Sequence, residues 1–351
     1  MIIIDGATKS GSGTIVRYAV GIAALLGKDI KIINIRARRS KPGLRPQHLV
    51  AVRAVADITG GSITGGEVGS HEIVFKPGNN VHGGKFKWDI GTAGSTTMLG
   101  MTILPAALLS RNSLECTVTG GLFQDYAPSY FHMRHVLAPV LHAMGLSFRV
   151  KMIRPGYVPA GNGILELDIG PVKKTLMPLS LCDQGNIESV DGIAFSSHLK
   201  DREVSGRMAE ICRRVLTKKG YKVHIREEYD GTAMQPGAAL AVYARTSARC
   251  VLGADRAGAP GRRSEAIGRF VARSLIEDLE TGATVDRYLA DQLILYAALA
   301  GGTTEYRIPF RTDHVETNLW LVQELLGCSF DIKENVIKIT GTGYTPHSYG
   351  R

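Results

Sequence analysis

The feature that most constrains this chain of 351 residues is an order of secondary structure that occurs three times. Apolar spacing and glycine clusters predict helix, strand, helix, strand, strand in each occurrence. The occurrences are spaced at roughly 80 to 100 residues, apart from one longer stretch before the third. An apolar segment, "MIIID", precedes the first helix and indicates a buried strand. The pattern therefore predicts a core of three repeated βαβαββ-like units.

The longer stretch, residues 184–280, has an order of its own. It reads as strand, helix, three strands and a long helix, which is enough for a small independent α/β domain. We expect residues 1–183 and 281–351 to form the repeated core and residues 184–280 to form an inserted domain. The predicted fold class is α/β (α+β).

Composition excludes several kinds of protein. Hydrophobic residues make up 44% and charged residues 21%, as in ordinary globular proteins. No apolar stretch is long enough for a membrane span, and the first residues lack the features of a signal peptide. The five cysteines are widely spaced with no CxxC pair, which favours neither a zinc site nor a disulfide framework. A cytoplasmic location is the simplest expectation.

Charge points to a polyanionic partner. The net charge is +10 and the isoelectric point is about 9.4. The run "NIRARRSKPGLRPQHL" contains Arg36, Arg38, Arg39, Lys41 and Arg45 with no acidic residue among them. A second basic run, "GRRSEAIGRFVARS", has its arginines spread around a predicted helix and indicates a solvated face.

The stretch "TDHVETNLW" places a histidine at a predicted helix start. Asp313 as N-cap and Glu316 three residues later are a start signal, so His314 is expected at the first helical position. Thr317 and Asn318 follow one turn away. A helix start attracts anions and disfavours a protonated imidazole, so a neutral histidine there is placed to meet phosphate. A lone histidine near a cap is, however, more often structural.

Other familiar signatures are absent from the sequence. "GATKSGSG" lacks the Lys-Ser or Lys-Thr that completes a Walker loop, and there is no HExxH or G-x-S-x-G motif. Glycine-rich turns at residues 11–14 and 91–96 run into predicted helices, where backbone N–H groups can cradle phosphate. Each of these turns alone is weak support for a phosphate site.

Four segments together resemble one known family. In order they are "RSKPGLRPQHLVAVRAVADITGG", "TAGSTTM", "YLADQLILYAALAGG" and "HVETNLWLVQELLG", and they are similar to the RNA 3′-terminal phosphate cyclase family over nearly the whole chain. The resemblance implies three repeated α/β units with an inserted domain. It also implies an ATP-dependent ligase-type enzyme that converts an RNA 3′-terminal phosphate to a 2′,3′-cyclic phosphate through histidyl-AMP and RNA-adenylate intermediates. ATP and a divalent cation (Mg or Mn) are the implied cofactors, and an RNA 3′ end is the implied partner.

The resemblance also implies roles for individual residues. His314, in the family's His-x-x-Thr-Asn context, is the expected nucleophile. Arg17 is expected beside the reacting phosphates, and Asp291 either orients His314 or helps to hold the cation. The remaining assignments are Tyr288, Gln292, Asn318, Arg39 and Gln47 to the nucleotide, and Arg36, Lys41 and His48 to the RNA.

The chain departs from the family pattern at several positions. Ser10 stands where the family has a glutamate that can serve the metal, Thr14 stands in place of a glutamine, and Phe131 stands at an acidic position. A glutamine usual after "TAGS" is also missing. A hard cation loses a carboxylate ligand as a result, so the metal ligands are left unassigned.

Two other functions remain open at this point. One is the non-catalytic branch of the same family, a ribosome-assembly factor that binds pre-ribosomal RNA and a GTPase. That branch lacks the histidine motif, whereas the missing glutamate mildly favours it. The other is a carboxyvinyl-transferase-like enzyme with the repeated fold, for which the basic run and the histidine motif give no support. Protein partners and oligomeric state are not predicted.

Overall fold

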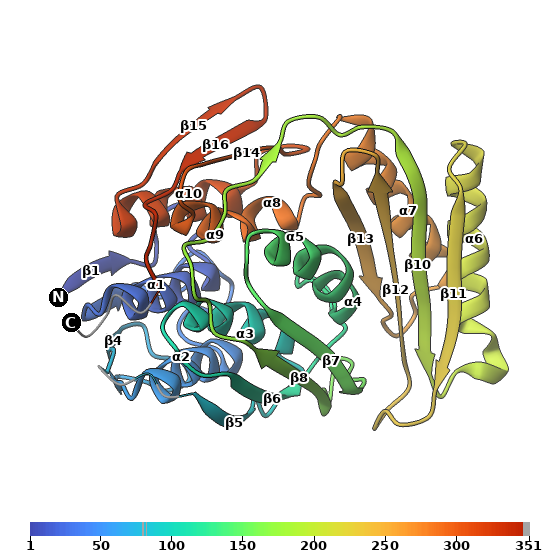
Figure 1. Ribbon diagram of the computed structural model, residues 1–351. Coiled ribbons are helices and arrows are strands. Elements are labelled where there is room, and N and C mark those ends of the chain that lie inside the picture. The colour runs from blue at the N-terminus through green and yellow to red at the C-terminus, as the bar shows by residue number, and fades with distance from the viewer. Residues whose placement is uncertain (79–80, 82, 347–351) are drawn as a thin grey trace.

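The computed structural model describes residues 1–78, 81 and 83–346, so residues 347–351 of the predicted core lie outside the described part. The predicted α+β class is confirmed. The described residues form four sheets of four strands each, and three of these sheets have the same strand order. Figure 1 shows how the helices and strands are arranged in space.

The first unit shows the repeated order in full. Its elements are β1 (Ile2–Asp5), α1 (Gly13–Leu26), β2 (Ile30–Ile33), α2 (Pro46–Thr59), β3 (Ser62–Thr64) and β4 (Ile73–Lys76). The sheet order is β1-β2-β4-β3, with β1 parallel to β2 and the other pairs antiparallel. Strand β1 lies at the edge of its sheet: Ile4 is 2% exposed but Ile3 is 63% exposed. The expectation of a buried first strand is therefore only half right.

The second unit has the same order with interrupted helices. Its elements are β5 (Gly84–Asp89), α3 (Thr96–Ile103), η1 (Leu104–Leu108), β6 (Leu114–Gly120), α4 (Tyr130–His132), η2 (Met133–Leu137), α5 (Ala138–Ala143), β7 (Phe148–Arg154) and β8 (Gly163–Ile169). The apolar spacing predicts two continuous helices here, over residues 94–110 and 130–145, and both predictions are wrong in detail. At Pro105 the first tightens into a 3₁₀ turn, and before Pro139 the second widens into a π turn. Proline lacks the N–H that a regular helix requires.

The third unit is divided by the insertion. Its elements are β9 (Ser180–Leu181), α8 (Leu289–Gln292), α9 (Ile294–Leu299), β14 (Thr303–Arg307), α10 (Asp313–Leu326), β15 (Ser329–Lys333) and β16 (Val336–Thr340). Read from β9, its sheet order β9-β14-β16-β15 matches the other two, and β9 is parallel to β14. Because β9 has only two residues, the sequence pattern did not predict it.

Residues between β9 and α8 form the fourth sheet and its helices, in the predicted order. The elements are β10 (Ile187–Ser197), η3 (Lys200–Arg202), α6 (Val204–Lys218), β11 (Val223–Asp230), β12 (Gly237–Thr246), β13 (Val251–Ala257) and α7 (Ser264–Glu280). Leu240 and Val242 of β12 pack in a cluster with α6 and α7, whereas Ala241 and Tyr243 join the main core. This alternation covers both faces of the sheet. Independent folding of residues 184–280 stays a prediction.

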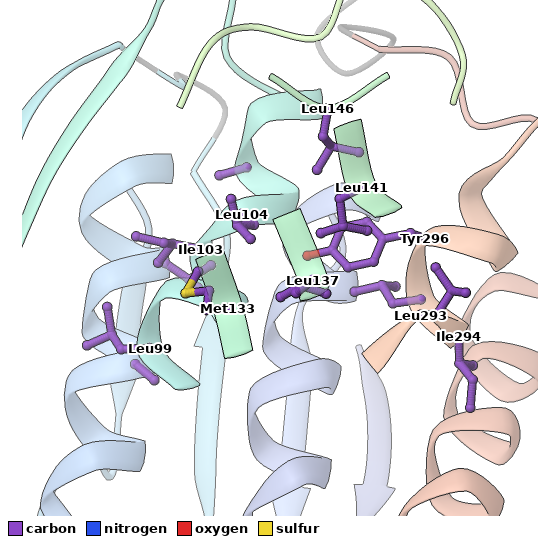
Figure 2. Close-up of a cluster of buried hydrophobic side chains, with 14 of the residues drawn as sticks. Leu99, Ile103, Leu104, Met133, Leu137, Leu141, Leu146, Leu293, Ile294 and Tyr296 are labelled. Carbon is purple, nitrogen blue, oxygen red and sulfur yellow. The ribbon is translucent and has the colours of Figure 1, made fainter. Parts of the chain in front are cut away.

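Helices of the repeated units meet in the centre of the molecule. Helix α1 is buried almost all round, with only Tyr18 and Leu26 partly exposed. Figure 2 shows how Leu137 and Leu141 of the second unit lie beside Leu293 and Tyr296 of the third. This packing joins the helices of different repeated units at the centre of the molecule.

Among the residues that the structure describes, no helix is both long enough and apolar enough to cross a membrane.

Candidate active site

Helix α10 begins one residue earlier than its sequence suggests. The Thr312 side chain accepts a hydrogen bond from Val315 N (3.2 Å), so Thr312 is the N-cap and Asp313 is the first helical residue. The predicted cap at Asp313 is wrong by one position, and His314 is the second residue of the helix rather than the first. Gly327 ends the helix with φ of 71°, as predicted.

Helix α1 begins against the same point. Ser12 is its N-cap, and Thr14 in its first turn lies 3.2 Å (Oγ1) from His314 Nδ1. Arg17 Nη2 donates to the same hydroxyl (3.3 Å). Ser10 N donates to Thr317 Oγ1 (3.1 Å), which ties the glycine-rich turn to α10. Residues about 300 positions apart in sequence therefore form one hydrogen-bonded group.

The ionisable groups of the site are strongly perturbed. Burial lowers the pKa of Arg17 to about 10. Burial, followed by the charges of Arg17 and Arg39, lowers the pKa of His314 below its ordinary value, which keeps the imidazole neutral near pH 7. Burial raises the pKa of Asp291 to about 7, against the opposing effect of Arg17.

Asp291 and His314 have different hydrogen-bond partners. Asn318 Nδ2 donates to the Asp291 carbonyl (3.0 Å) and to its carboxylate Oδ2 (3.3 Å). The His314 ring is instead oriented by its hydrogen bond with the Thr14 hydroxyl. Sequence reasoning noticed Thr14 as a departure from the family but did not give it this position.

A cavity of about 230 Å³ opens in front of these groups, lined by Thr14, Arg17, Tyr18, Gly21, Met98, Met101, Thr102, Pro105, Tyr126, Ala127, Pro128, Tyr288, Asp291, Gln292, Leu295, Tyr296 and His314. Gln292 and Tyr296 of this lining each have a buried polar atom, Gln292 Oε1 and the Tyr296 hydroxyl, with no hydrogen-bond partner among the described residues. Buried polar atoms are almost always paired, so these two are exceptions beside the cavity.

The segment between β2 and α2, residues 34–45, which we call the basic loop, lies beside the cavity. Arg36 Nη1 donates to the carbonyls of Lys41 and Gly43, which fixes the loop, while Arg39 and Lys41 are exposed. Arg38 Nη1 donates to Lys9 O (2.7 Å) and so joins the loop to the first glycine turn. Exposed guanidinium and ammonium groups beside the cavity suit the binding of an anionic chain.

Gln47 and His48 pack against the two glycine-rich turns of the site. Gln47 Oε1 accepts from Ser95 N (3.1 Å) and so anchors the second glycine-rich turn. His48, expected to contact RNA, is only 4% exposed, and burial lowers its pKa to about 3. A Cβ on Gly13 would lie 2.0 Å from His48 Nε2, so glycine is required there. The structure thus places this ring behind the first glycine turn, away from the surface.

Five of the predicted site residues line one cavity: Arg17, Tyr288, Asp291, Gln292 and His314. The others surround it or support it: Arg36, Arg39, Lys41, Gln47, His48 and Asn318. Besides the position of Thr14, the sequence analysis missed Tyr126 and Tyr296 as lining residues. An isolated tyrosine in a loop or helix carries no local signal for such a place.

The site residues do not make a protein cage for a divalent cation. Among the described residues there is no group of three His, Cys, Asp or Glu side chains able to hold a metal. The first glycine turn offers the hydroxyls of Ser10 and Ser12, 2.9 Å apart, where the family has a carboxylate. Asp291, the carboxylate of the cavity, is buried, and its raised pKa makes it a poor hard-cation ligand near neutral pH.

The fold and the site together define a class of protein. It is an α+β protein of three repeated βαβαββ units, with a neutral histidine and a buried arginine facing a cavity at the meeting point of the units. The chain belongs to the RNA 3′-terminal phosphate cyclase family, whose model matches residues 8–332.

The similarity to known proteins covers nearly the whole chain. It is 39% identical to an RNA 3′-terminal phosphate cyclase of Methanothermobacter thermautotrophicus, with 95% of this chain and 96% of the relative covered. The identity is 35% to the protein of that name from Pyrobaculum aerophilum, covering 97% and 98%. It is 36% to that from Pyrococcus furiosus, covering 96% of each.

Proposed function

We propose that this protein is an ATP-dependent enzyme that converts an RNA 3′-terminal phosphate to a 2′,3′-cyclic phosphate. The single observation that carries the proposal is the placement of His314. Its ring is neutral, lies at a helix start, and faces a cavity shared with Arg17. Relatives with 35% to 39% identity are named for this reaction.

In the first step, His314 Nε2 attacks the α-phosphorus of ATP. A P–N bond forms, the P–O bond to the β-phosphate breaks, and pyrophosphate leaves with that electron pair. Thr14 Oγ1 accepts from Arg17, and a hydroxyl has a second lone pair that accepts from His314 Nδ1–H. This arrangement leaves the Nε2 lone pair free for attack. Arg17 stabilises the negative charge that develops on the phosphate oxygens.

Two further steps consume the histidyl-AMP. An oxygen of the RNA 3′-phosphate attacks its phosphorus, the P–N bond breaks, and AMP passes to the RNA end. The adjacent 2′-OH then attacks the 3′-phosphorus and AMP leaves, which closes the cyclic phosphate. Asp291, whose pKa is raised to about 7, is suited to accept the 2′-OH proton near neutral pH.

The remaining residues divide the binding. Tyr288 offers a ring for the base, and Gln292 and Tyr296 line the same cavity. Asn318 is buried and positions Asp291. The basic loop supplies Arg39 and Lys41 for the RNA end, whereas Arg36 and His48 support it from within. A divalent cation, Mg or Mn, would arrive with the triphosphate.

Labelling with ATP tests the proposal. Incubation with α-labelled ATP and Mg or Mn is expected to give acid-labile, base-stable label on the protein, which His314→Ala abolishes. The matched control is His224→Ala, which removes an exposed histidine outside the cavity and should label normally. Addition of RNA with a 3′-phosphate should discharge the label and yield RNA lighter by one water.

Absence of label with all four nucleoside triphosphates and both metals would overturn the proposal. That result would leave the assembly-factor alternative, for which binding to ribosomal RNA without turnover is the expected behaviour.

A further inference from the structure

A second cavity, of about 520 Å³, lies where the inserted segment meets the second repeated unit. It is bounded by the starts of α6 and α7, by the loop around Pro236, and by the loop that contains Tyr157 and Pro159. Neither the predicted site nor the proposed reaction uses it.

The charge of this cavity has one sign. Four arginines line it and no acidic residue does, the four being Arg202, Arg207, Arg262 and Arg263. We call this cavity the arginine cleft. Four arginines around one cavity with no lining carboxylate attract a multiply charged anion.

Two of the four arginines are fixed and two are available. Arg262 is held bidentately by Asp125 (2.7 and 3.0 Å), and Arg207 by Ser264 (2.9 Å) and Glu265 (3.5 Å). Arg202 and Arg263 are exposed, and within the described chain their guanidinium groups have neither a hydrogen bond nor an ion pair to another residue. Their donors remain free for phosphate oxygens.

The floor of the arginine cleft is apolar. It includes Tyr157, Val204 and Ile267, which are buried, together with three prolines. The start of helix α7 adds positive partial charge to the cationic rim. Its N-cap residue, Arg263, makes no side-chain capping hydrogen bond, so the first backbone N–H groups of the helix lack that partner. An apolar floor below a cationic rim suits nucleotides, whose bases are flat and weakly polar while their linkages carry charge.

The arginine cleft adjoins the His314 cavity through a shared loop. Asp125 binds Arg262 and also Arg256 (3.1 Å) on the side of the insert. The next residue, Tyr126, is fully exposed and lines the His314 cavity. A single strand can therefore pass from one cavity to the other over residues 125–126, with the Tyr126 ring as a stacking surface.

We propose that the arginine cleft binds the phosphodiester backbone of the RNA a few nucleotides before its 3′ end. This inference rests on the proposed function, which puts the 3′ end at His314. The inserted segment then holds the body of the substrate while the repeated core acts on the end.

Two charge-matched double variants test the proposal. Arg202→Gln with Arg263→Gln removes the free donors of the cleft, whereas Arg269→Gln with Arg273→Gln removes two exposed arginines of α7 that do not line it. The probes are a 3′-phosphorylated single-stranded RNA of about 16 nucleotides, long enough to reach both cavities, and a 3′-phosphorylated dinucleotide.

The cleft variant should bind the long RNA about 10-fold more weakly relative to the dinucleotide. Its salt slope for the long RNA should fall by about 1.4, the value for two lost contacts on a single strand. The control variant should keep both the affinity ratio and the slope. Inorganic polyphosphate serves as a competitor, to distinguish a backbone site from one for free polyanions.

Three outcomes would overturn the proposal: an unchanged affinity ratio, an equal loss in the control variant, or displacement by polyphosphate at concentrations where unlabelled RNA fails to compete. These binding measurements do not depend on catalysis. If His314 takes no label while the long RNA still needs the cleft arginines, the proposed reaction fails and the RNA surface stands.

Discussion

The His314 cavity and the arginine cleft differ in how far their charged groups are buried. In the His314 cavity Arg17 is only 7% exposed, and the pKa values of Arg17, Asp291 and His314 are displaced from their ordinary values. In the arginine cleft the two free guanidinium groups are exposed. Burial strengthens electrostatic interactions and tunes acidity, which chemistry requires, whereas exposed cations grip a chain weakly and reversibly. The difference is the one expected if the His314 cavity is the reaction site and the arginine cleft binds the RNA backbone.

The largest effect is expected from a change of the buried cation. Arg17→Gln should lower the rate of His314 labelling by about 100-fold or more, because a preorganised charge at the phosphate is lost. Arg269→Gln, which removes an exposed arginine outside both cavities, should leave the rate unchanged. Single-turnover labelling with α-labelled ATP measures both. Equal rates for Arg17→Gln and the unaltered protein would contradict the prediction that the buried arginine matters for labelling and the exposed one does not.

A smaller effect should come from the residue that orients the nucleophile. Thr14→Val keeps the shape but removes the hydroxyl that faces His314 Nδ1, and should slow labelling by roughly 10- to 30-fold with little change in ATP affinity. Thr14→Ser restores the hydroxyl and should recover most of the rate. A loss that serine does not rescue would mean that the methyl group, not the hydrogen bond, matters.

A hydrogen bond beneath the arginine cleft should contribute to stability. The Tyr157 hydroxyl lies 2.8 Å from Ser197 Oγ, and both side chains are buried. Tyr157→Phe should lower the free energy of unfolding by about 1 kcal/mol, since Ser197 loses a partner. Denaturant unfolding measures it, and Tyr221→Phe, at a partly buried ring, is the comparison. No difference between the two variants would contradict the prediction.

The smallest effect concerns pH. In the proposed reaction His314 attacks only when neutral. Its pKa lies below the ordinary 6.5, so labelling should be constant at neutral pH and fall on acidification, with its midpoint below 6.5. Removing a nearby positive charge raises a histidine pKa. Arg39→Gln should therefore move the midpoint upward, by about 0.3 pH units. A midpoint that moves downward, or lies above 6.5 in the unaltered protein, would show that another group controls the profile.

The sequence predicted the repeated units because each helix and strand has its own periodicity and glycine boundary. The breaks at Pro105 and Pro139 could not be located as 3₁₀ and π turns, since proline indicates an interruption but not its geometry. Strand β9 was missed because two residues show no alternation. The cap of α10 was misplaced because Thr312 and Asp313 are both good N-cap residues.

The site was predicted less completely than the fold. His314, Arg17 and the residues around Asp291 followed from motifs, and the structure does bring them to one cavity. The contact between Thr14 and His314 joins segments 300 positions apart, so no local pattern could reveal it. His48 was assigned to the RNA by resemblance, and its burial against Gly13 could not be predicted because the two residues are 35 positions apart in the sequence.

The division of the third unit affects when the proposed active site can be completed during synthesis. Strand β9 leaves the ribosome more than a hundred residues before β14, its partner, and closing such a large loop slows pairing. His314 emerges later still, while Thr14 and Arg17 are among the first residues made. A chain released between the first unit and α10 contains Arg17 but lacks His314, so on the proposed mechanism such an incomplete chain cannot bind a nucleotide covalently at this site.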